Sequence, residues 1–299
     1  MDFVKYQHIE RFGAVETDGI ENGTCYIFPK IDGTNSSLWM DNGKLCAGSR
    51  NRILSLESDN AGFYAWALEQ EKIKDFFRLH RECRLYGEWL VPHTLKTYSA
   101  EAWRRFYVFD VVVIKEGDDS GTHIVYESYR PVLDRYGLDY IPPICKINHP
   151  TYEQLVGQLE KNVFLIGDGE GSGVGIVVKN YNYKNRFGKT IWAKIVKNEF
   201  KANHQKCEVS EIQGEKTVEE KIVYAILTNS LIEKEYAKIQ NEVGWSSRHI
   251  PMLFEKVFYN LVKEEIWEIL KKFKNPKIDF GTLKYWTQIK IKDTLPQLF

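Results

Sequence analysis

The hydrophobic pattern of this chain changes character near residue 206. Before that point, short apolar runs rich in aromatic and β-branched residues alternate with turn signals, which predicts β-strands with a few helices. Beyond it, segments 218–243 and 251–273 carry apolar residues at helical spacing and few strand signals. We therefore expect an α+β body of antiparallel sheets with flanking helices over residues 1–205, and a helical C-terminal domain over residues 206–299.

Turns, helices and strands within the body have recognisable signals. Residues 24–50 alternate as a hairpin does, and the Asp-Asn-Gly-Lys sequence at 41–44 is typical of a type I′ turn. Apolar residues recur at helical spacing over 60–80, and Ser58 or Asp59 is expected to cap that helix. Further apolar runs predict buried strands at 84–90, 105–114, 173–181 and 190–196.

Composition and charge exclude several classes of protein. The 299 residues include 41 basic and 41 acidic ones, so no net field attracts a polyanion and any nucleic-acid surface must be local. No apolar run reaches the roughly eighteen residues that a membrane span needs, and the charged start is not expected to direct secretion. The five scattered cysteines lack a C-x-x-C pair, so we expect reduced thiols in a cytoplasmic protein.

The segment Lys30-Ile31-Asp32-Gly33 places a lysine at the end of a predicted strand, next to a turn. A lysine amine can attack phosphorus when burial or nearby cations disfavour its protonated form. The strand end supplies rigidity, and the glycine lets the backbone approach a ligand closely. Taken alone, the segment is more typical of a solvated lysine at a hairpin edge than of a nucleophile.

Charged residues at the ends of other apolar strands extend this pattern. Glu88 is suited to ribose hydroxyls or a metal, although strand-end carboxylates are common without either role. An aromatic residue of strand 105–114 could stack on a base, although core packing explains most of that strand. Lys179, Lys194 and Lys197 close two further apolar strands, where ammonium groups need anionic partners such as phosphate.

These five segments, in this order, resemble the motifs of the covalent nucleotidyltransferase superfamily, which includes polynucleotide ligases and mRNA capping enzymes. The superfamily motifs are K-x-D-G, a strand with glycine and glutamate, an aromatic strand ending in F-D, E-G-x-V-x-K, and a final strand with two lysines. This chain reads KIDG, YGEW, FYVFD, VGIVVK and WAKIVK with comparable gaps. The resemblance implies a nucleotidyltransferase body of the ATP-grasp-like ligase type.

Asn35 and Arg50 narrow the resemblance from the whole superfamily to RNA ligases. DNA ligases usually carry arginine at the place of Asn35. Asparagine there, with an arginine 20 residues after the lysine, is similar to the second class of bacteriophage RNA ligases and to RNA-editing ligases. The phage members also have a helical C-terminal domain instead of an OB barrel. The likeness covers residues 25–200 by motif, and the tail by architecture alone.

The resemblance implies a monomeric, ATP-dependent RNA ligase that joins 5′-phosphate and 3′-hydroxyl ends. Lys30 would accept AMP from ATP, AMP would pass to the RNA 5′-phosphate, and the 3′-hydroxyl would displace it. Charge building on phosphorus requires lysines and Mg²⁺ or Mn²⁺ nearby. The implied catalytic residues are Lys30, Lys179 and Lys194, and the implied nucleotide-binding residues are Lys30, Ile31, Asp32, Asn35, Arg50, Glu88, Phe109, Lys179, Lys194 and Lys197. Tyr107 is the alternative to Phe109 as the adenine platform.

One position departs from the family pattern. The glutamate of E-G-x-V-x-K, which helps to bind the metal in the family, falls on Val174, and valine cannot ligate a cation. Glu170, four residues upstream, is the substitute carboxylate, so the implied metal ligands are Glu88 and Glu170. The glycines of 167–175 lack the G-K-[S/T] sequence and following helix of a P-loop, so we interpret them as a flexible loop.

Two other functions stay open on the sequence. A DNA ligase or GTP-using capping enzyme shares the first step, but both normally need an OB domain, and no motif of one follows Lys197. A non-catalytic RNA-binding relative is the second, and Val174 is the main argument for it. For an RNA partner, the stretch from Lys179 to Lys206 is expected to form a local basic surface with interleaved aromatic rings, although a solvated hairpin explains it equally well without the motifs. Its further basic residues are Lys184, Arg186, Lys189 and Lys201, and its rings are Tyr181 and Tyr183.

Overall fold

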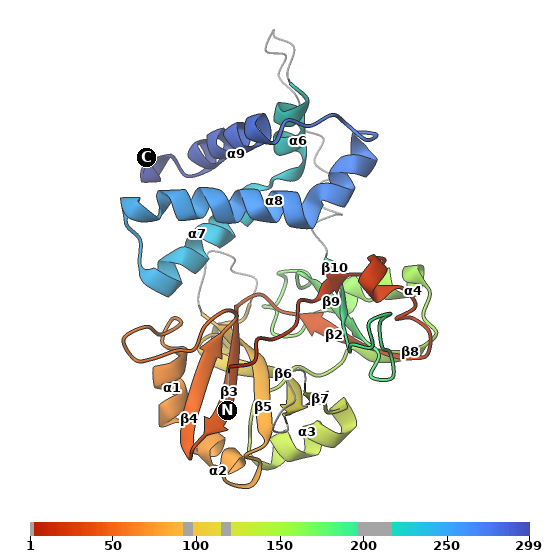
Figure 1. The fold of residues 1–299 in the computed structure, drawn as a ribbon, viewed down its shortest axis with the longest axis vertical. Helices are drawn as coiled ribbons and strands as arrows, with labels where there is room; N and C mark the ends of the chain where they lie inside the picture. Colours follow the sequence, from red (N-terminus) through yellow and green to blue (C-terminus); the bar gives the residue numbers. More distant parts are fainter. Residues whose placement is uncertain (1–2, 92–97, 115–120, 197–216) are drawn as a thin grey trace. The chain divides into compact units, whose positions relative to one another are not determined.

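The computed structural model describes residues 3–91, 98–114, 121–196 and 217–299 (Figure 1). Two compact units result, and residues 217–299 are the described part of the second. The first unit holds two sheets with flanking helices and the second is helical, which confirms the predicted α+β fold. The boundary expected between residues 205 and 206 lies outside the described residues. None of the helices described combines the length and apolar character needed to cross a membrane.

The first sheet has the strand order β4-β3-β5-β6-β7, and all neighbours in it are antiparallel. Its strands are β3 (Thr34–Asp41), β4 (Lys44–Ser49), β5 (Cys83–Leu90), β6 (Arg105–Val113) and β7 (Thr122–His123). The predicted hairpin joins β3 to β4, where Asp41 pairs with Lys44. Asn42 and Gly43 have φ angles of 49° and 78°, as a type I′ turn requires.

The second sheet has the order β1-β10-β9-β2-β8, with β1 parallel to β10 and the other neighbours antiparallel. Its strands are β1 (Glu10–Arg11), β2 (Thr24–Lys30), β8 (Cys145–Asn148), β9 (Gly175–Lys179) and β10 (Ala193–Val196). One face packs on α4 (Tyr152–Val156) and on the turn η3 (Leu159–Lys161) through Ile27, Ile176 and Leu155. The strand that ends in Lys30 is therefore an interior strand of the sheet, between β8 and β9.

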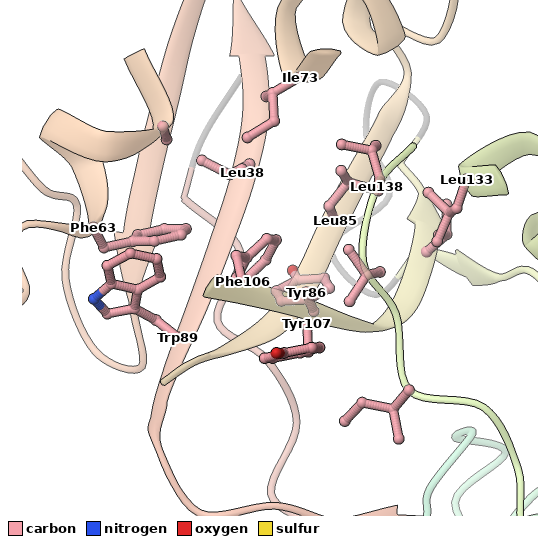
Figure 2. Close-up of a cluster of buried hydrophobic side chains, with 14 of the residues drawn as sticks. Leu38, Phe63, Ile73, Leu85, Tyr86, Trp89, Phe106, Tyr107, Leu133 and Leu138 are labelled. Carbon is pink, nitrogen blue, oxygen red and sulfur yellow. The ribbon is translucent and has the colours of Figure 1, made fainter. Parts of the chain in front are cut away.

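The main hydrophobic core joins the first sheet to α1 (Phe63–Glu69), α2 (Glu71–Leu79) and α3 (Tyr126–Arg135). In Figure 2, Phe63 of α1 lies against Trp89 of β5 and close to Phe106 of β6, with ring centroids 5.6 and 4.9 Å from Phe63. Burial of such large rings makes the main favourable contribution to folding. The face of the first sheet that carries Phe106 is therefore committed to the core.

The predicted helix over 60–80 is two helices, because Gln70 between α1 and α2 has extended backbone angles. Asp59, one of the two predicted caps, accepts hydrogen bonds from the Tyr64 and Ala65 amides at 2.8 and 3.0 Å. Its carboxylate thus satisfies the first free donors of α1. Short 3₁₀ turns complete the first unit at η1 (Val15–Thr17) and η2 (Ala100–Ala102).

The second unit is built from α6 (Val218–Ile226), α7 (Asn229–Val243), α8 (Ile250–Lys272) and α9 (Phe280–Thr294), with the turns η4 (Ser247–His249) and η5 (Pro296–Leu298). Its core contains Ile222, Ile232, Leu253, Val257, Leu261 and Leu283, all fully buried. In Figure 1, α8 runs between α7 and α9. The Thr217 and Thr228 side chains cap α6 and α7, each accepting an amide hydrogen bond at 3.2 Å.

Candidate active site

The KIDG segment forms a tightly held turn between the two sheets. Lys30 is the half-buried last residue of β2, and Thr34 begins β3. The Gly33 amide donates a hydrogen bond to Glu88 Oε1 at 3.0 Å. A Cβ at Gly33 would lie 2.5 Å from the Trp89 carbonyl oxygen, so only glycine fits against this strand. The turn that carries Lys30 is therefore fixed to β5 beside Glu88.

Ile31 and Asp32 complete this turn, and both are buried. The Ile31 side chain belongs to the main hydrophobic core. The Asp32 amide donates to Tyr98 Oη at 2.7 Å, and burial raises the pKa of the Tyr98 hydroxyl. The Tyr98 hydroxyl thus stays protonated and neutral while it accepts this bond. The two residues next to Lys30 serve to anchor its backbone.

Asn35, Glu88 and Tyr107 form one row across three strands of the first sheet. Asn35 pairs with Glu88, and Glu88 pairs with Tyr107, in the antiparallel ladders. Directly paired residues project from the same face of a sheet, with Cβ atoms about 4.5–5.5 Å apart. Because Glu88 also bonds the KIDG turn, the structure brings the predicted residues Asn35 and Glu88 together beside that turn.

The three predicted catalytic lysines share one face of the second sheet. Lys30 pairs with Gly175, and Lys194 pairs with Val177. Since side chains alternate along a strand, Gly175, Val177 and Lys179 point to the same face of β9, together with Lys30 and Lys194. The opposite face of the strands is the apolar one that packs on α4. Lys30, Lys179 and Lys194 therefore lie on one face of this sheet together with Arg11, which pairs with Lys194.

Lys179 connects this lysine face to the first sheet through a buried ion pair. Its Nζ donates to Asp110 Oδ1 at 2.8 Å and to the Phe109 carbonyl at 2.6 Å. The Lys179 side chain is 2% exposed and that of Asp110 is 0% exposed. Tyr6 Oη and Trp192 Nε1 also donate to Asp110 Oδ2, the latter at 3.0 Å. Lys179 therefore has a partner within the protein and does not depend on phosphate to compensate its charge.

The ionised state of Asp110 follows from these contacts. Burial by itself raises the pKa of Asp110, but the Lys179 ammonium and, after it, His123 hold that pKa well below the ordinary value. Burial lowers the pKa of Lys179, and the Asp110 carboxylate opposes that shift. Sequence reasoning did not single out Asp110, although an aspartate inside the apolar run FYVFDVV is the signal of a buried, paired charge.

Phe109 stands at an irregularity of β6. Tyr86 pairs with Asp110 and Gly87 with Val108, so Phe109 is the extra residue of a β-bulge. Bulges re-aim side chains next to active sites. The Phe109 ring is half-buried and lies 4.9 Å from the ring of Tyr6, between centroids.

Tyr107, the alternative platform, is buried in the main core and donates its hydroxyl to the Ala102 carbonyl at 3.2 Å. Burial raises the pKa of the Tyr107 hydroxyl to about 12. Because the Tyr107 ring is already packed, the structure favours the half-buried bulge residue Phe109 over Tyr107 as a ring that a ligand can reach.

Arg50 follows β4 directly and is exposed. Its Nη2 donates to His8 Nδ1 at 3.0 Å, and His8 Nε2 lies 3.8 Å from Glu10 Oε2. The N-terminal segment thus contacts a predicted nucleotide-binding residue, which no sequence signal indicated. Lys197, the remaining predicted one, lies outside the described residues.

The carboxylates available for a metal fit that role only in part. Glu88 is half-buried beside the KIDG turn, where a cation could reach it. Val174 directly precedes β9, next to the residue that pairs with Lys30, and it offers no oxygen from its side chain. Glu170 lies on an exposed turn closed by its own amide and the Gly167 carbonyl. Of the two predicted metal ligands, Glu88 therefore lies beside the KIDG turn, and Glu170 lies on an exposed turn.

Asn162 holds the loop on both sides of Val174, and no sequence signal indicated this role. Its Nδ2 donates to the Gly175 carbonyl at 2.6 Å, and its own carbonyl accepts from the Gly173 amide at 2.7 Å. A Cβ at Gly173 would lie 2.5 Å from Asn162 Nδ2. Gly175 pairs with Lys30, so the buried Asn162 amide contributes to the position of the β9 end next to Lys30.

The described part of the predicted basic stretch includes the loop between β9 and β10, whereas Lys201 lies outside the described residues. The predicted rings Tyr181 and Tyr183 are half-buried. Lys184, Arg186 and Lys189 are all exposed, and the Arg186 guanidinium lies 4.8 Å from the ring of the exposed Phe187. Asn185 Oδ1 accepts from the Phe187 and Lys189 amides, both at 3.0 Å, and shapes the loop. Within the described residues, this loop is a cationic surface with an accessible ring, as single-stranded nucleic acid requires.

The sequence model of the family described as RNA ligase matches residues 23–196. Among curated protein sequences, none matches this chain.

Solved structures share the fold at low sequence identity. A mutant of the Naegleria gruberi RNA ligase with ATP and Mn is 16% identical, with a TM-score of 0.52 over 68% of this chain and 59% of that chain. The same ligase with PPi is 17% identical, with a TM-score of 0.51 and the same coverage. A candidate ATP-dependent DNA ligase of Aquifex aeolicus is 16% identical, with a TM-score of 0.50 over 98% of this chain and 66% of that one. This chain thus spans 59% of the Naegleria ligase, and these likenesses show the fold alone.

Proposed function

Because the chain belongs to the RNA ligase family, we propose that it uses ATP to join RNA 5′-phosphate and 3′-hydroxyl ends through a lysyl-AMP and an RNA-adenylate. One observation carries the proposal: Lys30, Lys179 and Lys194 share one face of the second sheet. The Lys179–Asp110 pair joins that face to the face of the first sheet that carries Glu88. A triphosphate and a lysine nucleophile need this combination of cations and a nearby carboxylate.

In the first step we assign the nucleophile to Lys30. The neutral Nζ attacks the α-phosphorus of ATP, and an N–P bond forms as the bond to the pyrophosphate oxygen breaks. Pyrophosphate leaves with the bonding electron pair, and the amine proton passes to solvent. Lys30 suits this step because its backbone is fixed by the β9 ladder on one side and by the KIDG turn on the other.

The next two steps transfer AMP and seal the RNA. An oxygen of the RNA 5′-phosphate attacks the same phosphorus, the N–P bond breaks, and Lys30 regains a proton. The RNA 3′-hydroxyl then attacks the activated 5′-phosphate, a phosphodiester forms, AMP leaves, and the hydroxyl proton is released. Asn35 can donate to the 5′-phosphate, and Arg50 can bind phosphate or ribose oxygens through two parallel donors.

The roles of the remaining predicted nucleotide-binding residues are assigned from how deeply each side chain is buried and what it contacts. We assign the adenine platform to Phe109, and the charge on the α-phosphate to Lys194 and Lys197. Lys179 is a positioning residue in this proposal, since its ammonium holds the Phe109 carbonyl and the Asp110 carboxylate. Ile31 and Asp32 contribute their backbone rather than their buried side chains.

A divalent Mg²⁺ or Mn²⁺, when bound, neutralises charge on the reacting phosphates. Glu88 is the residue proposed to hold it, with Glu170 as a second ligand from its exposed turn. Replacing Val174 by glutamate adds a carboxylate beside the partner of Lys30. We expect Val174→Glu to lower the metal concentration needed for half-maximal adenylylation by about tenfold.

A matched substitution, Glu170→Ala, separates the two candidate ligands. If Glu170 already binds the metal, Glu170→Ala raises the metal requirement. Adenylylation rates of both variants over a titration of Mg²⁺ measure this. Both positions would be excluded from the metal site by one pair of results: Glu170→Ala leaves the adenylylation rate unchanged, and Val174→Glu gives no gain in rate at any metal concentration.

Nick sealing tests the proposed substrate. Family membership and Asn35 favour RNA, while the Aquifex likeness makes a DNA ligase the second candidate. We expect duplexes whose nick has an RNA 3′-hydroxyl strand to be sealed at least about tenfold faster than all-DNA nicks, because the 2′-hydroxyl distinguishes the two. ATP should support the reaction and GTP should not. Equal sealing of an all-DNA nick, or labelling by GTP alone, contradicts the proposal.

A further inference from the structure

A stripe of exposed side chains runs along α8 in the second unit. Met252, Lys256, Tyr259, Lys263 and Trp267 recur at intervals of four, three, four and four residues, which places them on one side of a helix. Tyr259 is 58% exposed, Trp267 is 64% exposed and Met252 is 40% exposed. The opposite side of α8 carries the fully buried Leu253, Val257 and Leu261. The two large rings are thus excluded from the core that α8 itself helps to form.

Lysines alternate with the rings in this stripe. Lys263 Nζ lies 5.3 Å from the centroid of the Tyr259 ring, and Lys256 is half-buried and lies 3.3 Å from Glu242 Oε2. Lys272, Lys274 and Lys277 are exposed and begin within two turns of Trp267.

The sequence that follows the stripe is also basic. Residues 271–292 contain one acid, Asp279, and seven lysines: 271, 272, 274, 277, 284, 290 and 292. The C-terminal end of the stripe therefore leads into strongly cationic sequence, although the whole chain has no net charge.

We propose that this α8 stripe binds a single-stranded part of the RNA substrate, with bases stacked on Tyr259 and Trp267 and phosphates on Lys263 and the lysines of 272–277. The inference rests on the proposed function and names a surface for its substrate. The two rings are eight residues apart, or about 12 Å along the helix axis, a distance that a few nucleotides can span. Aromatic rings with interleaved cations bind single strands without sequence preference.

The composition of the stripe favours RNA over a protein partner. Protein interfaces are enriched in aromatic residues and methionine but depleted in lysine at their centre. Here Lys263 lies between the two rings and in contact with one of them. A polyanion with flat bases matches both features, whereas a protein partner would have to bury the lysine.

The test is the affinity of the full chain for a fluorescent, 5′-phosphorylated single-stranded RNA, measured without ATP. Loss of one stacked base should weaken binding by about fivefold to 100-fold, so we expect at least about 25-fold for Tyr259→Ala with Trp267→Ala. The pair Tyr259→Phe with Trp267→Phe keeps flat rings and should stay within a few-fold of wild type. Lys263→Gln should reduce the slope of log affinity against log salt by about 0.7.

Tyr285 on α9 is the matched control, since it is 56% exposed in the same unit but lies off the stripe. Tyr285→Ala should leave RNA affinity unchanged, and circular dichroism should show every variant folded. If the folded double alanine variant binds RNA as tightly as wild type, the inference is wrong. This holds even if the variant changes the self-association of the chain, because that result would indicate a protein interface instead of an RNA site. The RNA affinity is measured without ATP, so it does not depend on adenylylation. A chain that forms no AMP adduct would therefore refute the proposed function, while the RNA affinities would still test the α8 stripe.

Discussion

Replacing Lys30 by alanine is expected to abolish the covalent AMP adduct, with a loss of at least about 10³-fold in adenylylation rate. The reason is chemical, because in the proposed first step the Lys30 amine itself forms the N–P bond. Incubation with ATP labelled at the α-phosphate and magnesium, followed by denaturing electrophoresis, measures the adduct directly.

Lys44 is the matched control for Lys30. It begins β4 at the type I′ hairpin and is exposed, so Lys44→Ala removes a lysine at a strand end without touching the candidate site. That variant should be labelled as strongly as wild type. Labelling of a folded Lys30→Ala protein at the wild-type rate would show that another lysine carries AMP.

Asp110→Asn is expected to destabilise the first unit by about 3–5 kcal/mol, because it leaves the buried Lys179 ammonium without a counter-charge. For a unit of this size the midpoint of thermal unfolding should fall by about 10 °C or more. Thermal and denaturant unfolding measure both quantities. The Phe109 carbonyl still accepts from Lys179, which keeps the effect below that of an isolated buried charge.

The double variant Asp110→Asn with Lys179→Met serves as its control. Removing both charges should recover part of the lost free energy of unfolding, since a buried pair is costly mainly when one partner remains. An Asp110→Asn protein within about 1 kcal/mol of wild type would contradict the account of this pair.

The same pair predicts a pH dependence. Because Lys179 and His123 hold the pKa of folded Asp110 below its unfolded value, its contribution is present at pH values above the unfolded carboxyl pKa of about 4. It is lost as the pH falls from there through the folded pKa. The difference between wild type and Asp110→Asn should therefore be constant near neutral pH and shrink in acid.

Local sequence signals predicted much of the fold correctly. The Asn42-Gly43 turn, the Asp59 cap and the change to helices in the tail each depend on a few neighbouring residues, so the sequence displays them directly. The KIDG turn and the strand of Glu88 were located for the same reason. Helix breaks at Gln70 and near Thr228 were missed, because the apolar spacing continues across both.

Contacts between distant segments could not be predicted. Lys179 and Asp110 are 69 positions apart and lie on different sheets, so their pairing depends on how the sheets meet. The bulge at Phe109 depends on a register shift opposite Tyr86 and Gly87, and the Asn162 contacts depend on a loop closing onto β9. These contacts hold the residues around Lys30 in place. Each of them joins segments that are distant in the sequence, so only the tertiary structure reveals it.

The central claim is that Lys30 forms a covalent bond to AMP. Its most direct test is a mass spectrum of the intact full chain after incubation with ATP and magnesium, followed by a peptide map of the product. The account predicts a gain of one AMP per chain, located on the peptide that contains Lys30. An unchanged mass over a full range of magnesium and manganese concentrations, or AMP mapped to any other residue, would contradict it.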